Sequence, residues 1–243
     1  MPKTYCIEVR GDFACFTRPE MKVERVSYDV ITPSASRAVF ESILWKPAIR
    51  WIPTKIEVLN PFRWISIRRN EVGSKMSVSN IGETMKKGSG SLGLFVEEDR
   101  QQRAGLFLKD VRYRLHARFE MTGFGHKGNH PYLSDIVQDQ EATDDALRAN
   151  TPEKFMFMFE RRASKGQCIN QPYLGCREFA CDFRLIEDLS REPEPVQENR
   201  ELGWMLYDMD FQNQENPMPQ FFNVQMKNGV IEIPDPNSDE VRK

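Results

Sequence analysis

The sequence predicts an α+β fold of the ferredoxin-like type, whose elements follow the order strand, helix, strand, strand, helix, strand. Two kinds of pattern predict this fold. Apolar and polar residues alternate with a period of two in several short segments, which is typical of half-buried strands. Two other segments start with Thr-Pro and space their apolar residues as a helix does. An insertion and a small C-terminal antiparallel β unit complete the expected fold.

The first three elements are a strand, a helix and a second strand. In residues 5–10, large apolar side chains alternate with shorter or charged ones, which predicts a strand. Thr32 can cap a helix, and Pro33 fits its first position, where the missing N–H is harmless. Pro47 ends this helix, and residues 52–59 form the second expected strand.

The most informative strand is expected over residues 106–122. From residue 111 onward the odd positions are apolar, while the even positions are charged or carry an imidazole. In an extended strand these two sets point to opposite faces. One face should join the core, and the other should display Asp110, Arg112, Arg114, His116, Arg118 and Glu120.

The remaining segments complete the predicted order. Residues 60–105 are polar and rich in glycine, and they are long enough to form an inserted hairpin. A second helix begins at Thr151-Pro152 and ends before Gly166, and a fourth strand covers residues 180–186. A polar, proline-rich segment at 191–195 then predicts a boundary. Beyond it, short strands are expected at residues 203–211, 221–226 and 230–234.

Charge is distributed unevenly between the two domains that this boundary separates, residues 1–190 and 191–243. The net charge of −2 combines 13 acidic and 5 basic residues from 187 onward, a balance of −8, with +6 in residues 1–186. Residues 46–76 alone carry seven basic side chains. This asymmetry predicts a basic front that binds a polyanion and an acidic tail that faces elsewhere.

Several function classes lack support in the sequence. The five cysteines are odd in number and form no CxxC pair, which favours reduced thiols in the cytoplasm over disulfides or a zinc ribbon. His126 and His130 have a spacing that zinc can use, but no further ligand lies near them, so a polar loop is expected there. The glycines fit no P-loop. No apolar stretch approaches the ~20 residues of a membrane span.

Five short blocks resemble the CRISPR-associated subunit of type I-C systems that cuts precursor repeat RNA, a member of the RAMP superfamily. They occur in the expected order over most of the chain. The blocks are GDFACFT at residues 11–17, SYDV at 27–30, ESILWKP at 41–47, LKDVRY at 108–113 and LGCREF at 174–179.

The resemblance implies an RRM-like N-terminal domain and a small C-terminal β domain. It also implies that CRISPR repeat precursor RNA is cut at the base of its hairpin, without a metal or another cofactor. The 5′ end of the product would stay bound inside the surveillance complex. The expected chemistry is attack by the RNA 2′-hydroxyl, which needs a base, a proton donor and cations beside the phosphorane.

The resemblance also suggests site residues. The family's central-strand lysine and histidine fall at residues 115–117, where His116 is the expected acid or base because an imidazole exchanges protons near neutral pH. Lys46 and Arg118 are the expected stabilising cations. The family's tyrosine before Trp-Lys-Pro is replaced by Leu44, which cannot transfer a proton. The side chains expected to contact RNA are Arg50, Arg68, Arg69, Lys75, Arg112, Arg114 and Arg177.

Two further functions stay open. Leu44 in place of tyrosine favours a non-catalytic subunit that only grips the 5′ handle of the CRISPR RNA. A basic groove also fits a role on DNA, because phosphate contacts do not distinguish the two nucleic acids. The expected partners are precursor RNA and the other subunits of the type I-C complex, in the cytoplasm and without a membrane.

Overall fold

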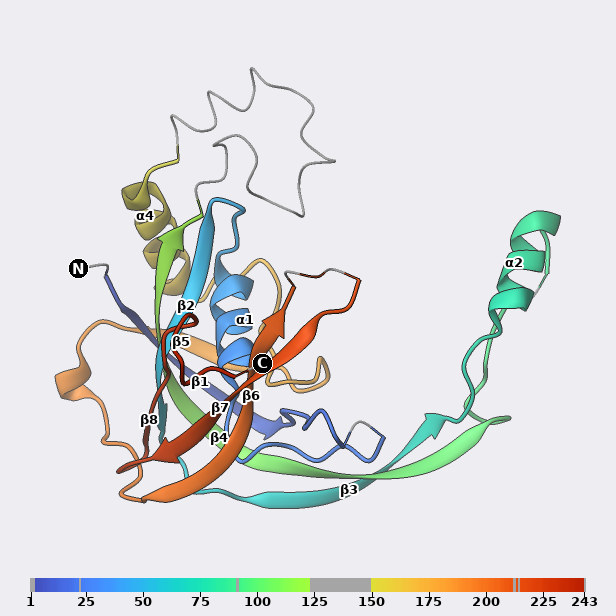
Figure 1. The fold of residues 1–243 in the computed structure, drawn as a ribbon, viewed down its shortest axis with the longest axis horizontal. Coiled ribbons are helices and arrows are strands. Elements are labelled where there is room, and N and C mark those ends of the chain that lie inside the picture. The colour runs from blue at the N-terminus through green and yellow to red at the C-terminus, as the bar shows by residue number, and fades with distance from the viewer. Residues whose placement is uncertain are drawn as a thin grey trace.

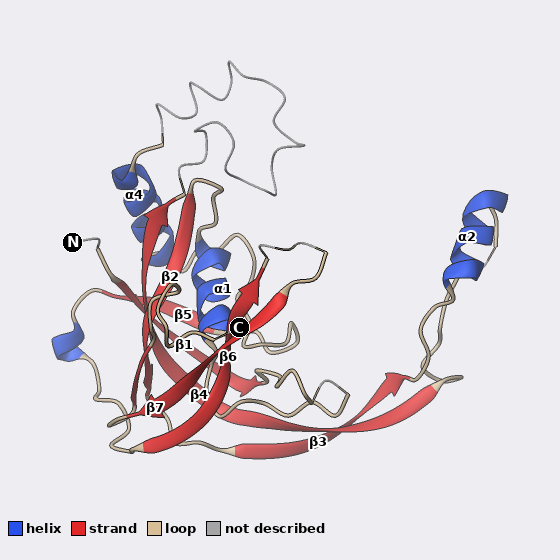
Figure 2. Ribbon diagram, viewed as in Figure 1, coloured by secondary structure: helices blue, strands red, loops and turns tan. Residues whose placement is uncertain are grey.

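The computed structural model describes residues 3–21, 23–90, 92–122, 150–211, 213 and 215–242. They form a mixed α/β fold with antiparallel sheets (Figures 1 and 2). The strands are β1 (Tyr5–Ala14), β2 (Ile49–Val58), β3 (Trp64–Val72), β4 (Arg100–Met121), β5 (Asp182–Ile186), β6 (Arg200–Asp210), β7 (Met218–Met226) and β8 (Val230–Glu232). The α-helices are α1 (Pro33–Ile43), α2 (Val78–Lys87) and α4 (Pro152–Ala163).

The main sheet is built around β4, which has 22 residues and pairs with different strands along its length. Its second half lies between β1 and β2, in the strand order β5-β1-β4-β2-β8, and its first half pairs with β3. Asp110, with a φ of 53°, lies between the two halves. The register sets Leu115 beside Ile7 of β1 and Ile56 of β2. One long strand therefore joins the body of the molecule to its inserted hairpin.

Both core helices start where the sequence predicts. The Thr32 hydroxyl accepts a hydrogen bond from the Ala35 N–H at 3.2 Å, and the Thr151 hydroxyl accepts one from the Lys154 N–H at 3.3 Å. In each helix the residue after the cap is a proline. Such caps each stabilise a helix by about 1 kcal/mol. The expected helices at the start and middle of the chain are confirmed.

The core lies between the sheet and the helices α1 and α4. Phe40 of α1 and Phe159 of α4 both contact Trp51 of β2, with ring centroids 5.0 and 4.7 Å apart from it. Tyr5 of β1 packs edge-on against Phe159 at 4.8 Å. Burying one such ring contributes about 1.5–3 kcal/mol. The two helices therefore cover one face of the sheet, and the even positions of β4 lie on the other.

The inserted segment forms a long β arm that reaches away from the body (Figure 1). β3 pairs with the first half of β4 from Trp64 opposite Leu108 to Val72 opposite Arg100. At the end of the arm, α2 starts at the cap Ser77, and Gly88 with a φ of 64° ends it. No residue of α2 is buried. The expected hairpin is present, with a helix at its tip that the sequence analysis did not predict.

The C-terminal residues do not all enter one small sheet. β6 and β7 form a two-stranded sheet whose apolar residues, such as Met205 and Phe222, belong to the main core cluster. The Tyr28 hydroxyl accepts a hydrogen bond from the Leu206 N–H at 3.2 Å. β8 was expected in the C-terminal unit, but it pairs with β2 at the edge of the main sheet, from Glu57 to Lys55. Its pairing partner is remote in sequence, so local alternation cannot identify it.

None of the helices in the described ranges combines the length and the apolar character needed to cross a membrane.

Candidate functional site

The even positions of β4 face away from the helices, as their alternation predicts, but they are not an open basic surface. Arg114 and His116 are only 3% and 5% exposed, while Arg112 and Arg118 are partly exposed. The expectation that all four side chains are displayed to solvent is wrong for the middle two. Both lie against the buried carboxylate of Glu57 on the neighbouring strand β2.

Glu57 of β2 is the carboxylate that holds His116 and Arg114. Its two oxygens lie 2.9 Å from His116 Nε2 and 2.6 Å from Arg114 Nε, and Lys55 Nζ lies 2.8 Å away. Burial alone would raise the pKa of Glu57, but the hydrogen bonds from His116 and Lys55 lower it to about 2. Glu57 therefore stays charged and fixes the orientation of the imidazole.

Glu8 of β1 pairs with Arg112, as Glu57 pairs with Arg114. Arg112 binds it in a bidentate way at 2.8 and 3.0 Å, and Arg184 of β5 reaches it at 2.6 Å. Arg184 also pairs with Glu192, which lies after β5. Burial raises the pKa of Glu8, but Arg112 and Arg184 bring it below its ordinary value. Arg112 and Arg114 of this face therefore pair with buried acids, Glu8 and Glu57.

A hollow of about 700 Å³ connects His116 with the surface. It lies between the start of β1, α4 and the end of β5, and Cys6, Lys3, Glu160 and Arg161 are among its lining residues. The Cys6 sulfur lies 3.6 Å from His116 Nε2, and burial raises the pKa of this thiol to about 12. Lys3, Arg161 and the His116 imidazole thus share this space with three acids, Glu160, Glu187 and Asp188, and Lys3 pairs with Glu160 at 2.5 Å.

Lys46 lies beyond the C-terminal end of β4. It belongs to the connection between α1 and β2, where the Pro47 carbonyl accepts a hydrogen bond from the Thr122 hydroxyl at 2.7 Å. Thr122 follows His116 by six residues, which is roughly 20 Å along a strand. The structure therefore does not bring Lys46 and His116 together.

Of the two expected stabilising cations, Arg118 lies nearer to His116. It is two residues along the same face of β4, about 7 Å away along the strand. It pairs with Glu120 and with Asp235, the latter at 3.3 Å. Arg50 is exposed and lies opposite Glu120 in the β2–β4 register.

The other predicted RNA contacts gather on the arm and at its base. Arg68 and Lys75 are exposed on the arm, and Arg177 is exposed on the turn at 174–179. Arg69 is engaged instead, because it pairs with Glu178 at 2.5 Å and stacks on Phe107.

Sequence reasoning missed Glu8, Glu57 and Arg184 as parts of the site. The alternation in residues 5–10 and 52–59 already sets both glutamates on one face of their strands. Only the strand order could show that this face is the one that carries His116.

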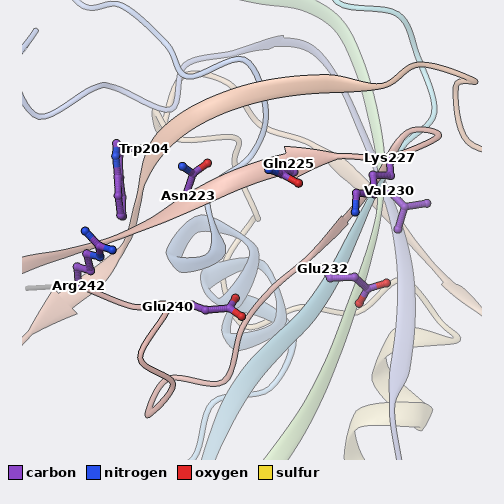
Figure 3. Close-up of a pocket in the computed structure, with 8 residues that line it drawn as sticks. All are labelled: Trp204, Asn223, Gln225, Lys227, Val230, Glu232, Glu240 and Arg242. Carbon is purple, nitrogen blue, oxygen red and sulfur yellow. The ribbon is translucent and has the colours of Figure 1, made fainter.

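A second hollow of about 770 Å³ lies on the β6–β7 sheet (Figure 3). The Arg242 guanidinium stacks over the Trp204 ring at 4.9 Å. Lys227 and Arg242 face Glu232 and Glu240 within the same lining. None of the sequence-predicted site residues lines this hollow.

His126 and His130, the pair with a possible zinc spacing, lie outside the described residues. Among the residues that are described, no three His, Cys, Asp or Glu side chains gather as metal ligands would.

Comparisons with known proteins show the family of the chain. A family model described as CRISPR-associated protein (Cas_Cas5) matches residues 4–234. A protein of Mannheimia succiniciproducens named CRISPR pre-crRNA endoribonuclease Cas5d is 46% identical over 98% of this chain and 97% of its own length. A Thermus thermophilus protein of the same name is 36% identical over 94% and 90%. A solved structure described as a CRISPR-associated protein shares the fold, with a TM-score of 0.66, 21% identity and coverage of 100% and 97%. The chain belongs to the Cas5d family of CRISPR-associated proteins.

Proposed function

We propose that this protein is an endoribonuclease that cuts CRISPR repeat precursor RNA and stays on the 5′ handle of the product as a subunit of a type I-C surveillance complex. One observation carries this proposal: a relative named as a pre-crRNA endoribonuclease is 46% identical over nearly the full length of both chains. The free thiols of all five cysteines agree with a cytoplasmic location.

The proposed framework is ferredoxin-like and RRM-like. Its support is the sheet order β5-β1-β4-β2 with α1 and α4 on one face. In this scheme residues 1–190 form the RNA-binding and catalytic domain, interrupted by the arm at about 60–105. Residues 191–243 form a small β unit that packs against it.

His116 is the proposed acid or base. Its Nε2 is bound to Glu57 at 2.9 Å, so Nδ1 is the nitrogen left to exchange a proton with the RNA. RNA would reach it through the hollow that Lys3 and Arg161 flank. The 2′-hydroxyl attacks the adjacent phosphorus, the 5′ oxygen leaves with a proton, and Arg118 stabilises the added negative charge. This scheme needs no metal.

The exposed cations are the proposed RNA contacts. Arg50, Arg68, Lys75 and Arg177 are exposed. Lys46, whose place is remote from His116, joins this group as a contact with RNA rather than with the reacting phosphate. Arg112, Arg114 and Arg69 already pair with carboxylates, so RNA would have to displace Glu8, Glu57 or Glu178 to reach them.

The decisive experiment is single-turnover cleavage of the cognate repeat RNA in excess EDTA. The proposal expects full cleavage, and no product when the nucleotide 5′ of the cut carries a 2′-deoxy sugar. Undiminished cutting of the deoxy substrate would exclude the 2′-hydroxyl mechanism. Cleavage that stops in EDTA and returns with Mg²⁺ would exclude the metal-free one.

The role of His116 needs a separate comparison of rate and affinity. His116→Ala should slow cleavage at saturating RNA by at least about 100-fold, because general acid–base catalysis contributes ~10²–10⁴-fold. The affinity for uncut RNA should change little. Lys109→Ala, an exposed cation on the same strand, is the matched control and should keep the wild-type rate. An unchanged rate in the His116 variant would remove it from the site.

A second candidate function is a binding subunit without cleavage. Leu44 favours it, since an aliphatic side chain replaces the phenol of related proteins. Tight binding of repeat RNA without product over hours, for protein with a native unfolding transition, would decide for this function. Competition between RNA and DNA of equal sequence at one salt concentration tests the DNA-directed alternative.

A further inference from the structure

Two cysteines that are 161 residues apart in sequence meet at the base of the arm. Cys15 follows the end of β1, and Cys176 lies in the turn at 174–179. Cys15 is fully buried and Cys176 is 9% exposed, and both pack against Phe107 in a small apolar cluster. The Cys176 thiol donates a hydrogen bond to the Cys15 carbonyl oxygen at 3.8 Å, and the Cys15 sulfur lies 3.5 Å from the Thr17 hydroxyl.

The backbone is built to hold these cysteines close. The Cys15 N–H donates to the Leu174 carbonyl at 3.0 Å, so the two segments are joined directly. Gly175 has a φ of 85°, and a Cβ there would lie 2.0 Å from the Cys15 carbonyl oxygen. Only glycine permits this approach. It brings the backbone of Cys15 against the residue that precedes Cys176.

The surroundings of Cys176 favour its thiolate. Its neighbours are the Cys15 side chain and Arg25, whose Nη1 lies 3.5 Å from the Cys176 sulfur. Together they lower the pKa of Cys176, whereas burial raises the pKa of Cys181 to about 12. A cysteine beside a guanidinium and at the edge of solvent has the features of a reactive thiol.

We propose that Cys15 and Cys176 are a site of reversible oxidation, which closes to a disulfide when the protein meets a peroxide. The Cys176 thiolate attacks one peroxide oxygen and breaks the O–O bond, which yields a sulfenic acid and, after protonation, water. The Cys15 thiol then attacks the sulfenic sulfur, its proton goes to the leaving hydroxide, and a second water departs. Two thiols are oxidised, and one hydrogen peroxide is reduced to two waters.

The disulfide would affect the contacts at the base of the arm. The turn that carries Cys176 also carries Glu178, which pairs with Arg25 at 3.5 Å and with Arg69 of β3. Oxidation removes the thiolate from this group and leaves Arg25 to the carboxylates of Glu178 and Glu71. It also ties the turn covalently to the residues that follow β1. This consequence follows whether or not the proposed nuclease function is correct.

The test is peptide mapping of the full-length, reduced protein after exposure to hydrogen peroxide. Free thiols are blocked with N-ethylmaleimide, and the protein is digested without reductant. The expected product is a linked pair of peptides containing Cys15 and Cys176, two hydrogens lighter than the separate thiols and released by dithiothreitol. Its rate of formation should rise severalfold from roughly pH 6 to pH 8 as Cys176 ionises.

Variants give the controls. Cys176→Ser and Cys15→Ser should each abolish the linked pair, while Cys181→Ser, the matched buried cysteine, should leave it unchanged. Arg25→Gln should slow its formation. Peptide mapping of the wild-type protein tests the proposal even if a variant fails to fold. The proposal is overturned if native protein, fully reacted with peroxide, shows no Cys15–Cys176 link, or if Cys168 is the main partner of either residue.

Discussion

Glu57→Gln tests whether the charged network on the face of the sheet stabilises the protein. The substitution keeps the shape of the side chain but removes the charge that faces Lys55, Arg114 and His116. Arg114 is 3% exposed, so water cannot replace the lost carboxylate. Removing one partner of a buried ion pair costs about 3–5 kcal/mol.

The pKa of Glu57 gives a similar value for its contribution to the free energy of folding, and it predicts how that contribution depends on pH. Lowering this pKa from 4.5 to about 2 corresponds to about 3 kcal/mol of folding free energy, since each pH unit is worth ~1.4 kcal/mol. The folded pKa lies below the unfolded one. The contribution is therefore complete above about pH 4.5 and is lost as the pH falls toward about 2.

The assay is urea unfolding of wild type and Glu57→Gln at neutral pH and at several acidic pH values. We expect a difference of about 3 kcal/mol at pH 7 that narrows steadily below roughly pH 4.5. Glu83→Gln, which removes an exposed pair with Lys87 on α2, is the control and should change stability by less than ~1 kcal/mol. The reasoning would be refuted if the unfolding free energies of wild type and Glu57→Gln differed by less than ~1 kcal/mol, or by the same amount at pH 3 and pH 7.

Three further predictions address the turn, the arm and the RNA contacts. Gly175→Ala should destabilise the fold by at least about 2 kcal/mol in thermal unfolding, because its Cβ would overlap a backbone carbonyl, whereas Gly82→Ala on α2, with open space around it, should be neutral or stabilising. Val78→Ser with Met85→Ser should leave the unfolding midpoint unchanged, since these side chains are 83% and 77% exposed, but should weaken assembly with other complex subunits in size-exclusion chromatography. Unchanged assembly would exclude α2 as a contact. Lys46→Ala should weaken RNA binding a few-fold and reduce the slope of log affinity against log salt by about 0.7, measured by electrophoretic mobility shift, and an unchanged slope would exclude a phosphate contact.

Local patterns in the sequence were sufficient for the elements of the core. Thr32 and Thr151 each cap a helix because the hydroxyl accepts a hydrogen bond from a free N–H group of the first turn. The proline that follows has no N–H group that would need a partner. The alternation in β4 correctly divides Leu115 from His116. The edge pairing of β8 with β2 was missed, because a three-residue strand carries no signal of its partner.

The burial of the site could not be predicted in the same way. A period of two shows which side chains share a face, but not what covers that face. Arg114 and His116 are buried, and both lie against Glu57 of the adjacent strand β2. The expected basic surface was therefore correct in its composition, and its expected exposure was wrong for these two residues.

The position of Leu44 limits where cleavage chemistry can occur. Leu44 is fully buried in the core, and its carbonyl accepts a hydrogen bond from the Trp51 indole at 2.8 Å. Lys46, two residues later, is exposed, yet it lies roughly 20 Å along β4 from His116. Groups that act on one phosphate must lie within a few ångströms of it. Cleavage at His116 would therefore use cations other than Lys46, and it should keep its rate at saturating RNA when Lys46 is removed.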